Sequence, residues 1–211
     1  MDSLMTGLAF FQKGGFAMYL ILLCSFVVLG IAIERFTFYR KMQPKQRDFS
    51  EQAKALIAKE DWSKLLTLCQ SSDGIVARVL AKIVVYRKER LEVYKELMEG
   101  EITLAVAKLG ENLNHLESIV TVAPLLGLLG TVLGMIHSFS VLNLKSGQPL
   151  AITGGVGEAL IATAAGLCVA IVSMFCYSYF SHRLDRILTE FQEFSLLLLA
   201  KRTEGDCHEN S

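Results

Sequence analysis

Glu158 is the residue of this sequence that most needs a chemical explanation. It lies near the start of an apolar stretch, "GGVGEALIATAAGLCVAIVSMFCY", residues 154–177, where a charge inside a bilayer costs a few kcal/mol or more. Thr163 follows on the same stretch, and Thr131 lies on another apolar stretch. Their hydroxyls can hydrogen-bond backbone carbonyls or line a path for water. Glu158, Thr131 and Thr163 are therefore candidates for an ion or proton pathway, and a buried structural acid is the alternative.

The expected distance of Glu158 from the start of its helix limits the states that its carboxyl group can adopt. A carboxylate at a helix N-terminus gains roughly 0.3–1 kcal/mol from the helix dipole. If the helix begins just after Pro149, however, Glu158 lies about 12 Å inside it. We therefore expect it to be protonated, hydrated in a pore or paired with a partner chain, because the apolar stretches that carry Glu158, Thr163 and Thr131 contain no Lys or Arg. His137 is either a proton relay or an interfacial histidine, and His115 is interpreted as solvated.

Composition indicates a membrane protein. The 211 residues are 52% hydrophobic, with a mean hydropathy of +0.42. Twenty-one Lys and Arg balance 21 Asp and Glu, so net charge favours no nucleic-acid partner. The cysteines show no C-x-x-C or metal-ligand spacing, and we interpret them as small apolar residues: Cys24, Cys69, Cys168, Cys176 and Cys207.

Three uncharged runs are long enough to cross a bilayer as helices. Most basic residues lie between Arg35 and Lys108, which predicts that this connection is on the inside. The first run is expected to be an uncleaved anchor, since no positive region precedes it and no A-x-A site follows. The expected organisation is a periplasmic N-terminal arm 1–13, transmembrane helix 14–39, cytoplasmic helical region 40–117, transmembrane helix 118–144, periplasmic turn 145–149, transmembrane helix 150–181 and cytoplasmic tail 182–211 of an inner-membrane protein.

The inside region is expected to be helical. Ser50 and Asp61 are predicted N-caps, and "SSDG" separates two helices. An apolar stripe then continues at helical spacing, which predicts one rod running unbroken into the second span. Such a rod favours packing against other copies of the chain, with packing inside the same chain as the alternative; Trp62 is expected to be a packing residue. The stripe is Leu91, Tyr94, Met98, Ile102, Ala105, Leu109, Leu113 and Leu116.

Small residues share one face of each later span. Such faces let helices approach closely in lipid, where van der Waals contact must drive association. Pro124 lies where the second span begins, and its missing N–H predicts a bend that is either architectural or a hinge. The residues expected to act in helix packing or as a hinge are Pro124, Gly127, Gly130, Gly134, Ala162 and Gly166.

The segments "APLLGLLGTVLGM" and "GEALIATAAGLCVAI" closely resemble the MotA/TolQ/ExbB proton-channel family, in particular its ExbB and TolQ branch. The resemblance covers the whole chain in topology and is strongest over residues 123–172. The matching positions are Ala123, Pro124, Gly127, Gly130, Thr131 and Gly134 in the second span, and Glu158, Ala159, Leu160, Ala162, Thr163 and Gly166 in the third.

The resemblance implies an all-α membrane protein that assembles as a homo-pentamer. The second and third helices would line a central pore that holds two copies of a single-span ExbD- or TolR-type partner with a membrane Asp. The proton-motive force would energise TonB or TolA through that partner, without a cofactor or metal. Glu158, Thr131 and Thr163 match positions that face the pore near the partner's Asp.

The alternatives are ranked by what the residues support. ExbB-like energisation of TonB-dependent transport is favoured over a TolQ-like role in envelope integrity, and a non-conducting scaffold is more remote. A stator of the MotA branch usually has four spans. An enzyme is not expected, because the sequence shows no Ser/His/Asp grouping or Gly-rich phosphate loop, and a self-contained transporter would need more spans.

Overall fold

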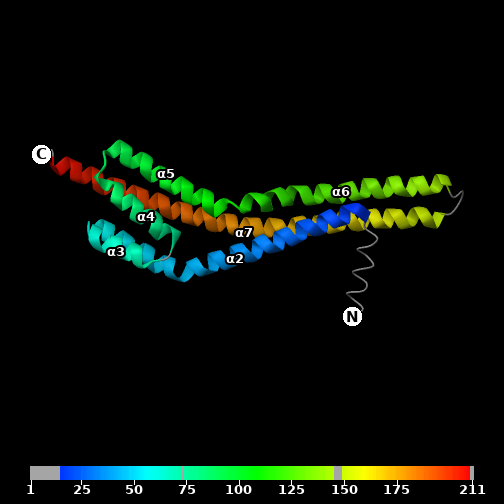
Figure 1. The fold of residues 1–211 in the computed structure, drawn as a ribbon, viewed down its shortest axis with the longest axis horizontal. Coiled ribbons are helices and arrows are strands. Elements are labelled where there is room, and N and C mark those ends of the chain that lie inside the picture. The colour runs from blue at the N-terminus through cyan, green and yellow to red at the C-terminus, as the bar shows by residue number, and fades with distance from the viewer. Residues whose placement is uncertain (1–14, 73, 145–148, 210–211) are drawn as a thin grey trace. The chain divides into compact units, whose positions relative to one another are not determined.

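The protein is built from helices. The computed structural model describes residues 15–72, 74–144 and 149–209, apart from the side chains of 40–47, 141–153 and 204–209. The elements in this part of the chain are α2 (Gly15–Ala58), α3 (Trp62–Ser71), α4 (Ile75–Val85), the 3-10 helix η1 (Tyr86–Lys88), α5 (Leu91–Gly110), α6 (Leu113–Leu144) and α7 (Pro149–Glu209) (Figure 1). The prediction of an all-α protein is confirmed.

Three helices are long and apolar enough to cross a membrane, over Gly15–Tyr39, Leu113–Ser140 and Gly154–Thr203. Large apolar side chains on them face outward, as Phe175 does with 74% of its surface exposed and Phe16 with 69%. Such side chains are stable on a surface that faces lipid and costly on one that faces water. The protein is a multi-pass membrane protein, as its sequence predicts. The arm 1–13 and most of the turn 145–149 lie outside the described residues.

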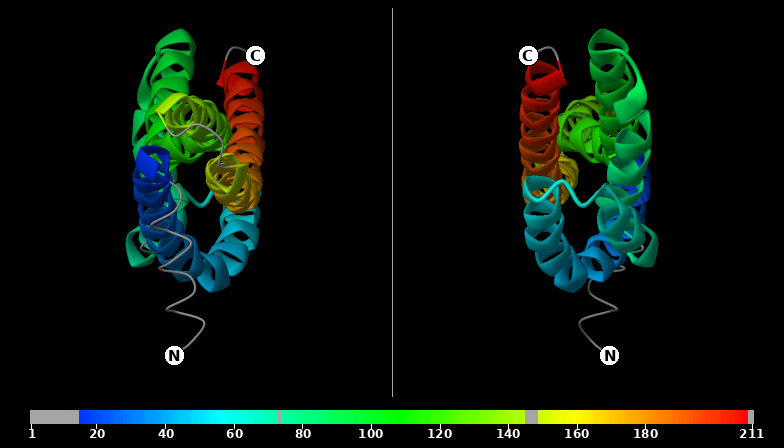
Figure 2. Two further views of the ribbon diagram at one scale, coloured as in Figure 1. Left: turned by 90° about the vertical axis from the view of Figure 1, so that its right-hand side faces the viewer. Right: turned by 90° about the vertical axis from the view of Figure 1, so that its left-hand side faces the viewer.

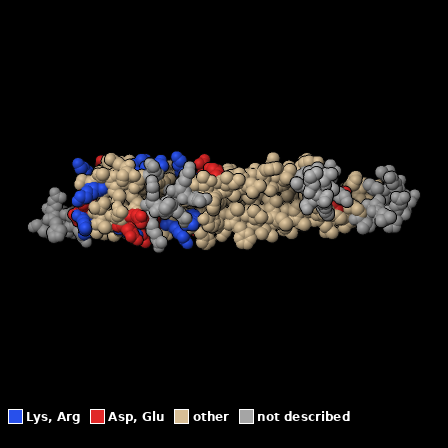
Figure 3. All heavy atoms as spheres, turned by 90° about the horizontal axis from the view of Figure 1, so that it is seen from below, with Lys and Arg blue, Asp and Glu red and all other residues tan. Residues whose placement is uncertain are grey.

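The chain forms two compact units. Unit 1 comprises Met1–Glu34 and Asn112–Tyr179, and unit 2 comprises Arg35–Glu111 and Phe180–Ser211. In unit 1, the first part of α2 (blue) lies beside α6 and α7 (yellow-green and yellow) (Figure 2). The described residues of unit 1 include only three carboxylates, Glu34, Glu117 and Glu158, and no Lys or Arg. On the face shown in Figure 3, charged side chains likewise gather in some areas, and a stretch of described residues is almost uncharged.

Unit 2 buries the apolar stripe within the chain itself. Tyr94, Met98, Ala105 and Leu109 of α5 are each at most 6% exposed, and α5 packs on α4 and η1. Lys82 and Glu101 join α4 to α5 by an ion pair of 2.8 Å. The alternative of packing within the same chain therefore holds for these four residues, whereas Leu91 and Ile102 of the stripe remain half-buried. Packing of the stripe against other copies of the chain stays a prediction.

Burial also shapes the chemistry of unit 2. It raises the pKa of the Tyr94 hydroxyl to about 12 and that of the Cys69 thiol to about 11, because burial penalises the charged form. Arg87 stacks over Trp62, with its guanidinium carbon 4.8 Å from the ring centroid. Trp62 thus contacts a side chain of its own unit, in keeping with a packing residue. Cys69 is buried and free, as expected of a small apolar residue.

The predicted unbroken rod is wrong. Helix α5 ends at Gly110, and α6 begins at Leu113. Glycine is a poor helix former, costing about 1 kcal/mol relative to alanine. The last carbonyls of a helix also need partners from outside it, and the buried Arg35 side chain donates from Nη1 to the Leu109 carbonyl at 3.0 Å. A side chain from α2 therefore satisfies the end of α5.

The predicted helix start at Ser50 is also wrong, because α2 continues through it to Ala58. Phe49, Ala53 and Ile57 recur every four residues and are each at most 5% exposed. This apolar face needs a continuous helix, and its packing outweighs the local capping preference of serine. The separation at "SSDG" is confirmed, since α3 ends at Ser71 and α4 begins at Ile75.

The cap of α3 gives a testable stability effect. The Asp61 carboxylate accepts from the Lys64 backbone N–H at 3.2 Å and from the Ser63 hydroxyl at 2.9 Å, which confirms the predicted N-cap. Asp61→Ala should lower the melting temperature of the full chain in detergent by about 2–4 °C, measured by circular dichroism. Asp61→Asn should stay close to wild type, because its amide oxygen can accept the same bond. Equal melting temperatures for the two variants would contradict the cap.

The same cap should depend on pH. The Lys64 side chain, with Ser63 and the Lys64 N–H, lowers the pKa of Asp61 to about 2, below the ordinary value of about 3.9. The stabilisation is therefore present above pH 4 and is lost as the pH falls from about 4 through about 2. As the pH falls from about 4 to about 2, the melting temperature of wild type should fall relative to that of Asp61→Asn.

Candidate functional site

A close helix contact in unit 1 joins α6 to α7 through small residues. A Cβ atom at Gly166 would lie 2.5 Å from the Ala123 carbonyl oxygen and 3.1 Å from the Gly127 Cα. A Cβ at Gly130 would lie 2.6 Å from the Cβ of Ala162, which is fully buried. Real Cβ atoms are essentially never closer than 3.0 Å to another heavy atom. The two backbones can therefore approach this closely only because these positions lack a side chain.

The contact continues along both helices. A Cβ at Gly134 would lie 2.9 Å from the Ala159 Cβ, and one at Gly155 would overlap the Ser138 side chain. Ala159 and Ser138 are each 3% exposed. The small residues therefore form a continuous α6–α7 contact.

The two candidate threonines have different partners. Thr163 on α7 donates its hydroxyl to the Gly127 carbonyl of α6 at 2.9 Å, in a partly buried position. Thr131 donates to the Leu128 carbonyl of its own helix at 2.6 Å and remains partly exposed. Thr163 therefore links α6 to α7. The Thr131 hydroxyl bonds within α6, and the Thr131 side chain stays partly exposed.

Pro124 lies inside α6, which continues on both sides of it. The proline nitrogen has no hydrogen, so the Val120 carbonyl loses its usual helical partner. The carbonyl oxygen of the neighbouring Ala123 is the atom that a Cβ at Gly166 would meet first. Pro124 thus lies between two residues of the α6–α7 contact, Ala123 and Gly127, and its role as a hinge stays a prediction.

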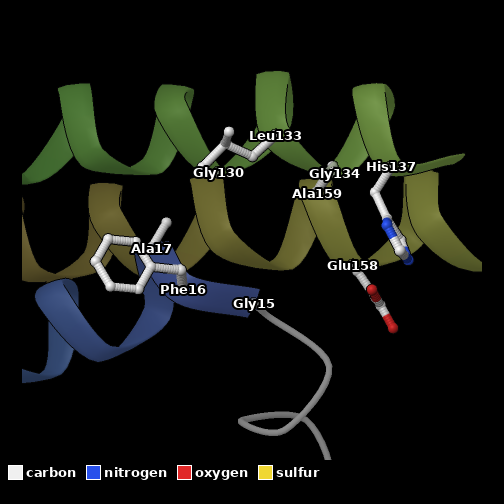
Figure 4. Close-up of a pocket in the computed structure, with 9 residues that line it drawn as sticks. All are labelled: Gly15, Phe16, Ala17, Gly130, Leu133, Gly134, His137, Glu158 and Ala159. Carbon is white, nitrogen blue, oxygen red and sulfur yellow. The ribbon is translucent and has the colours of Figure 1, made fainter. Parts of the chain in front are cut away.

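Glu158 lines a cavity of about 150 Å³ formed by three helices. Its walls are Gly15, Phe16 and Ala17 from α2, Gly130, Leu133, Gly134 and His137 from α6, and Glu158 and Ala159 from α7 (Figure 4). A water molecule needs about 10–15 Å³ of such space and a polar partner. The cavity can therefore hold several waters in contact with the carboxylate.

The structure brings together only part of the predicted pathway. Glu158, Gly130 and Gly134 line the cavity, whereas neither Thr131 nor Thr163 is among its lining residues. Thr131 follows the lining residue Gly130 directly in sequence, and Thr163 lies at the helix contact. The role of these residues as a proton pathway stays a prediction.

Two features of the cavity escaped the sequence analysis. The first is the start of α2, where Ala17 is 1% exposed and its Cβ would lie 3.2 Å from a Cβ at Gly130. The sequence does not predict that Ala17 packs on Gly130, because a single small residue in each span forms no recognisable pattern. The second is the position of His137 in the same cavity as Glu158, which depends on the register of α6 against α7. The sequence offered His137 as a proton relay or an interfacial histidine but did not place it beside Glu158.

Comparison with known proteins identifies related chains. Residues 70–193 match the model of the MotA/TolQ/ExbB proton channel family. A biopolymer transport protein of Synechocystis described as ExbB-like 1 is 34% identical over 176 residues, covering 79% of this chain and 67% of the relative. The ExbB-like 3 protein of the same organism is 31% identical over 173 residues, covering 80% and 82%. The biopolymer transport protein ExbB of Neisseria gonorrhoeae is 47% identical over 77 residues, covering 36% and 34%.

The glycine contact gives a test of the packing. Gly166→Ala places a methyl group against backbone atoms of α6, and overpacking of this kind costs about 1–3 kcal/mol. We expect a lower melting temperature for the purified chain in detergent. Gly157→Ala on the same helix is the control, because a Cβ there meets nothing within 4 Å. Equal melting temperatures for wild type, Gly166→Ala and Gly157→Ala would contradict this packing.

Proposed function

Since the chain belongs to the MotA/TolQ/ExbB proton channel family, we propose that it is a subunit of an inner-membrane proton channel driven by the proton-motive force. The observation that carries the proposal is the position of Glu158. This carboxylate lines a cavity large enough for water between three apolar helices. The described residues of its unit offer no Lys or Arg to neutralise it. A fixed structural role would favour a paired or sealed acid.

The proposed orientation places the N-terminus in the periplasm and the C-terminus in the cytoplasm. Unit 2 then lies on the cytoplasmic side. Its charge supports this, because most basic residues of the chain lie between Arg35 and Lys108, and basic residues concentrate on the cytoplasmic side of membrane proteins.

The proposed assembly is a homo-pentamer around a central pore. The open side of α6 supports it, since Leu125, Leu128 and Phe139 are each more than half exposed and Thr131 remains accessible. In this arrangement, α6 and α7 line the pore, and two copies of an ExbD/TolR-type single-span partner lie in it. The Glu158 carboxylate would then face an ionisable group on another chain.

The proposed mechanism uses Glu158 as a group that exchanges protons with water. One elementary charge crossing 100 mV is worth about 2.3 kcal/mol, so several protons are needed for each cycle of movement against load. A hydrated acid can bind and release protons quickly, whereas a tight buried ion pair would be slow to break. Thr163 keeps α6 and α7 in register through its bond to the Gly127 carbonyl, and Thr131 offers a hydroxyl on the open side of α6.

The proposed output is energised TonB-dependent transport across the outer membrane. The names of the relatives support the ExbB branch, because these proteins are described as ExbB or ExbB-like biopolymer transport proteins. Energy would pass from this chain through the single-span partner to a TonB-type protein.

Replacement of Glu158 tests the proposal. Glu158→Gln and Glu158→Ala should each lower proton flux by at least about 100-fold, the low end of the effect of a positioned acid–base group. Flux is measured with a pH-sensitive dye in proteoliposomes that contain the chain and its single-span partner under an imposed potential. Glu117→Gln, which alters another acid of unit 1 that lies on α6 outside the cavity, should conduct like wild type.

Assembly is measured on the same samples by native mass spectrometry. Intact complexes without flux support the channel. Full flux in Glu158→Gln would refute the proton pathway, and loss of assembly in both Glu158 variants would favour a structural acid in a non-conducting scaffold.

A further inference from the structure

His137 lines the same cavity as Glu158, and the proposed path through the carboxylate and the two threonines does not use it. The two side chains come from different helices, α6 and α7. Figure 4 shows both on the same side of the helix pair, with the imidazole extending from α6 toward the region occupied by the carboxylate. The register of the α6–α7 contact therefore brings together a potential cation and a potential anion.

His137 is the one side chain in the described part of unit 1 that can place a positive charge close to Glu158. These residues include no Lys or Arg, and their histidines are His115 and His137. Both lie on α6, separated by about 33 Å along the helix at 1.5 Å per residue. His115 therefore lies far from the cavity.

The other described walls of the cavity carry no titratable group. Helix α2 contributes Gly15, Phe16 and Ala17, and the remaining positions on α6 and α7 are Gly130, Leu133, Gly134 and Ala159. His137 and Glu158 are therefore the two groups on the described walls that can exchange protons with water in this cavity.

We propose that His137 is a second proton-exchange group of this cavity, which passes protons to and from Glu158 through water held between them. The proposal rests on the proposed function and adds a residue to its pathway. Imidazole suits this task because its ordinary pKa lies near neutrality. The volume of about 150 Å³ is sufficient for bridging waters.

The exchange is balanced in protons and charge. The imidazolium gives one N–H proton to a cavity water, and that water gives one of its protons to the carboxylate. An imidazolium and a carboxylate thus become a neutral imidazole and a carboxylic acid. The imidazole then regains a proton from a hydronium ion in the water at the open side of the cavity, which leaves a neutral water molecule. In the proposed channel, the proton-motive force supplies that proton.

Proton flux as a function of pH tests this role. The chain and its single-span partner are reconstituted in proteoliposomes, and flux is recorded as the bath on the N-terminal side is varied between about pH 5 and 8. His137→Gln keeps a polar side chain but cannot accept a proton in this range. We expect at least about a tenfold loss of flux, together with loss of the wild-type pH dependence. His115→Gln on the same helix is the matched control and should retain both.

A second measurement applies even if His137→Gln does not assemble. The chain is labelled with 15N-histidine, and the titration midpoints of both histidines are followed by NMR in wild type and in Glu158→Gln. The proposal predicts that the His137 midpoint moves when Glu158 is replaced and that the His115 midpoint does not. An unchanged His137 midpoint overturns it.

The flux outcomes separate this inference from the proposed function. If Glu158→Gln blocks flux while His137→Gln keeps the wild-type rate and pH profile, the role of His137 is refuted and the channel stands. If Glu158→Gln conducts like wild type, the proposed function itself fails.

Discussion

The close contact between α6 and α7 is the interaction on which the rest of unit 1 depends. In lipid, no hydrophobic force drives two apolar helices together, so their association depends on van der Waals contact and on the few polar bonds between them. Gly127, Gly130 and Gly166 allow the backbones to touch, and the Thr163 hydroxyl fixes the register by its bond to the Gly127 carbonyl. A shift of one residue along either helix would put side chains where only glycine fits.

This register also accounts for the chemistry of the cavity. It places Glu158 of α7 opposite His137 of α6 and leaves space that the first residues of α2 close on a third side. The helices thus combine an apolar outer surface with a small, mostly apolar cavity in which His137 and Glu158 are the polar side chains. The proposed proton pathway uses this interior, and the proposed pentamer would use the remaining exposed surface of α6.

The sequence predicted the parts of this account that depend on composition and local pattern. Long uncharged runs predict membrane spans wherever they occur, and Asp61 before an apolar segment predicts an N-cap. Small residues at intervals of three and four predicted which faces of α6 and α7 could approach closely.

Tertiary contacts explain what the sequence did not predict. The break at Gly110 depends on Arg35, a residue far away in sequence, which bonds to the end of α5. The continuation of α2 past Ser50 depends on the burial of Phe49, Ala53 and Ile57. His137 could be recognised as part of the Glu158 cavity only once the register of two helices was known, because its own surroundings in the sequence resemble those of an interfacial histidine.

The proposed channel requires that Glu158 exchange protons with water. Infrared difference spectroscopy of the assembled channel in lipid tests it most directly, by comparing the carboxyl C=O stretching region of wild type and Glu158→Gln in H2O and D2O as the bath pH is changed. If Glu158 exchanges protons, wild type should show a band that is absent from the variant, responds reversibly to pH and shifts within seconds of transfer to D2O. A Glu158 band that responds to neither pH nor D2O would identify a sealed structural acid and refute the exchange.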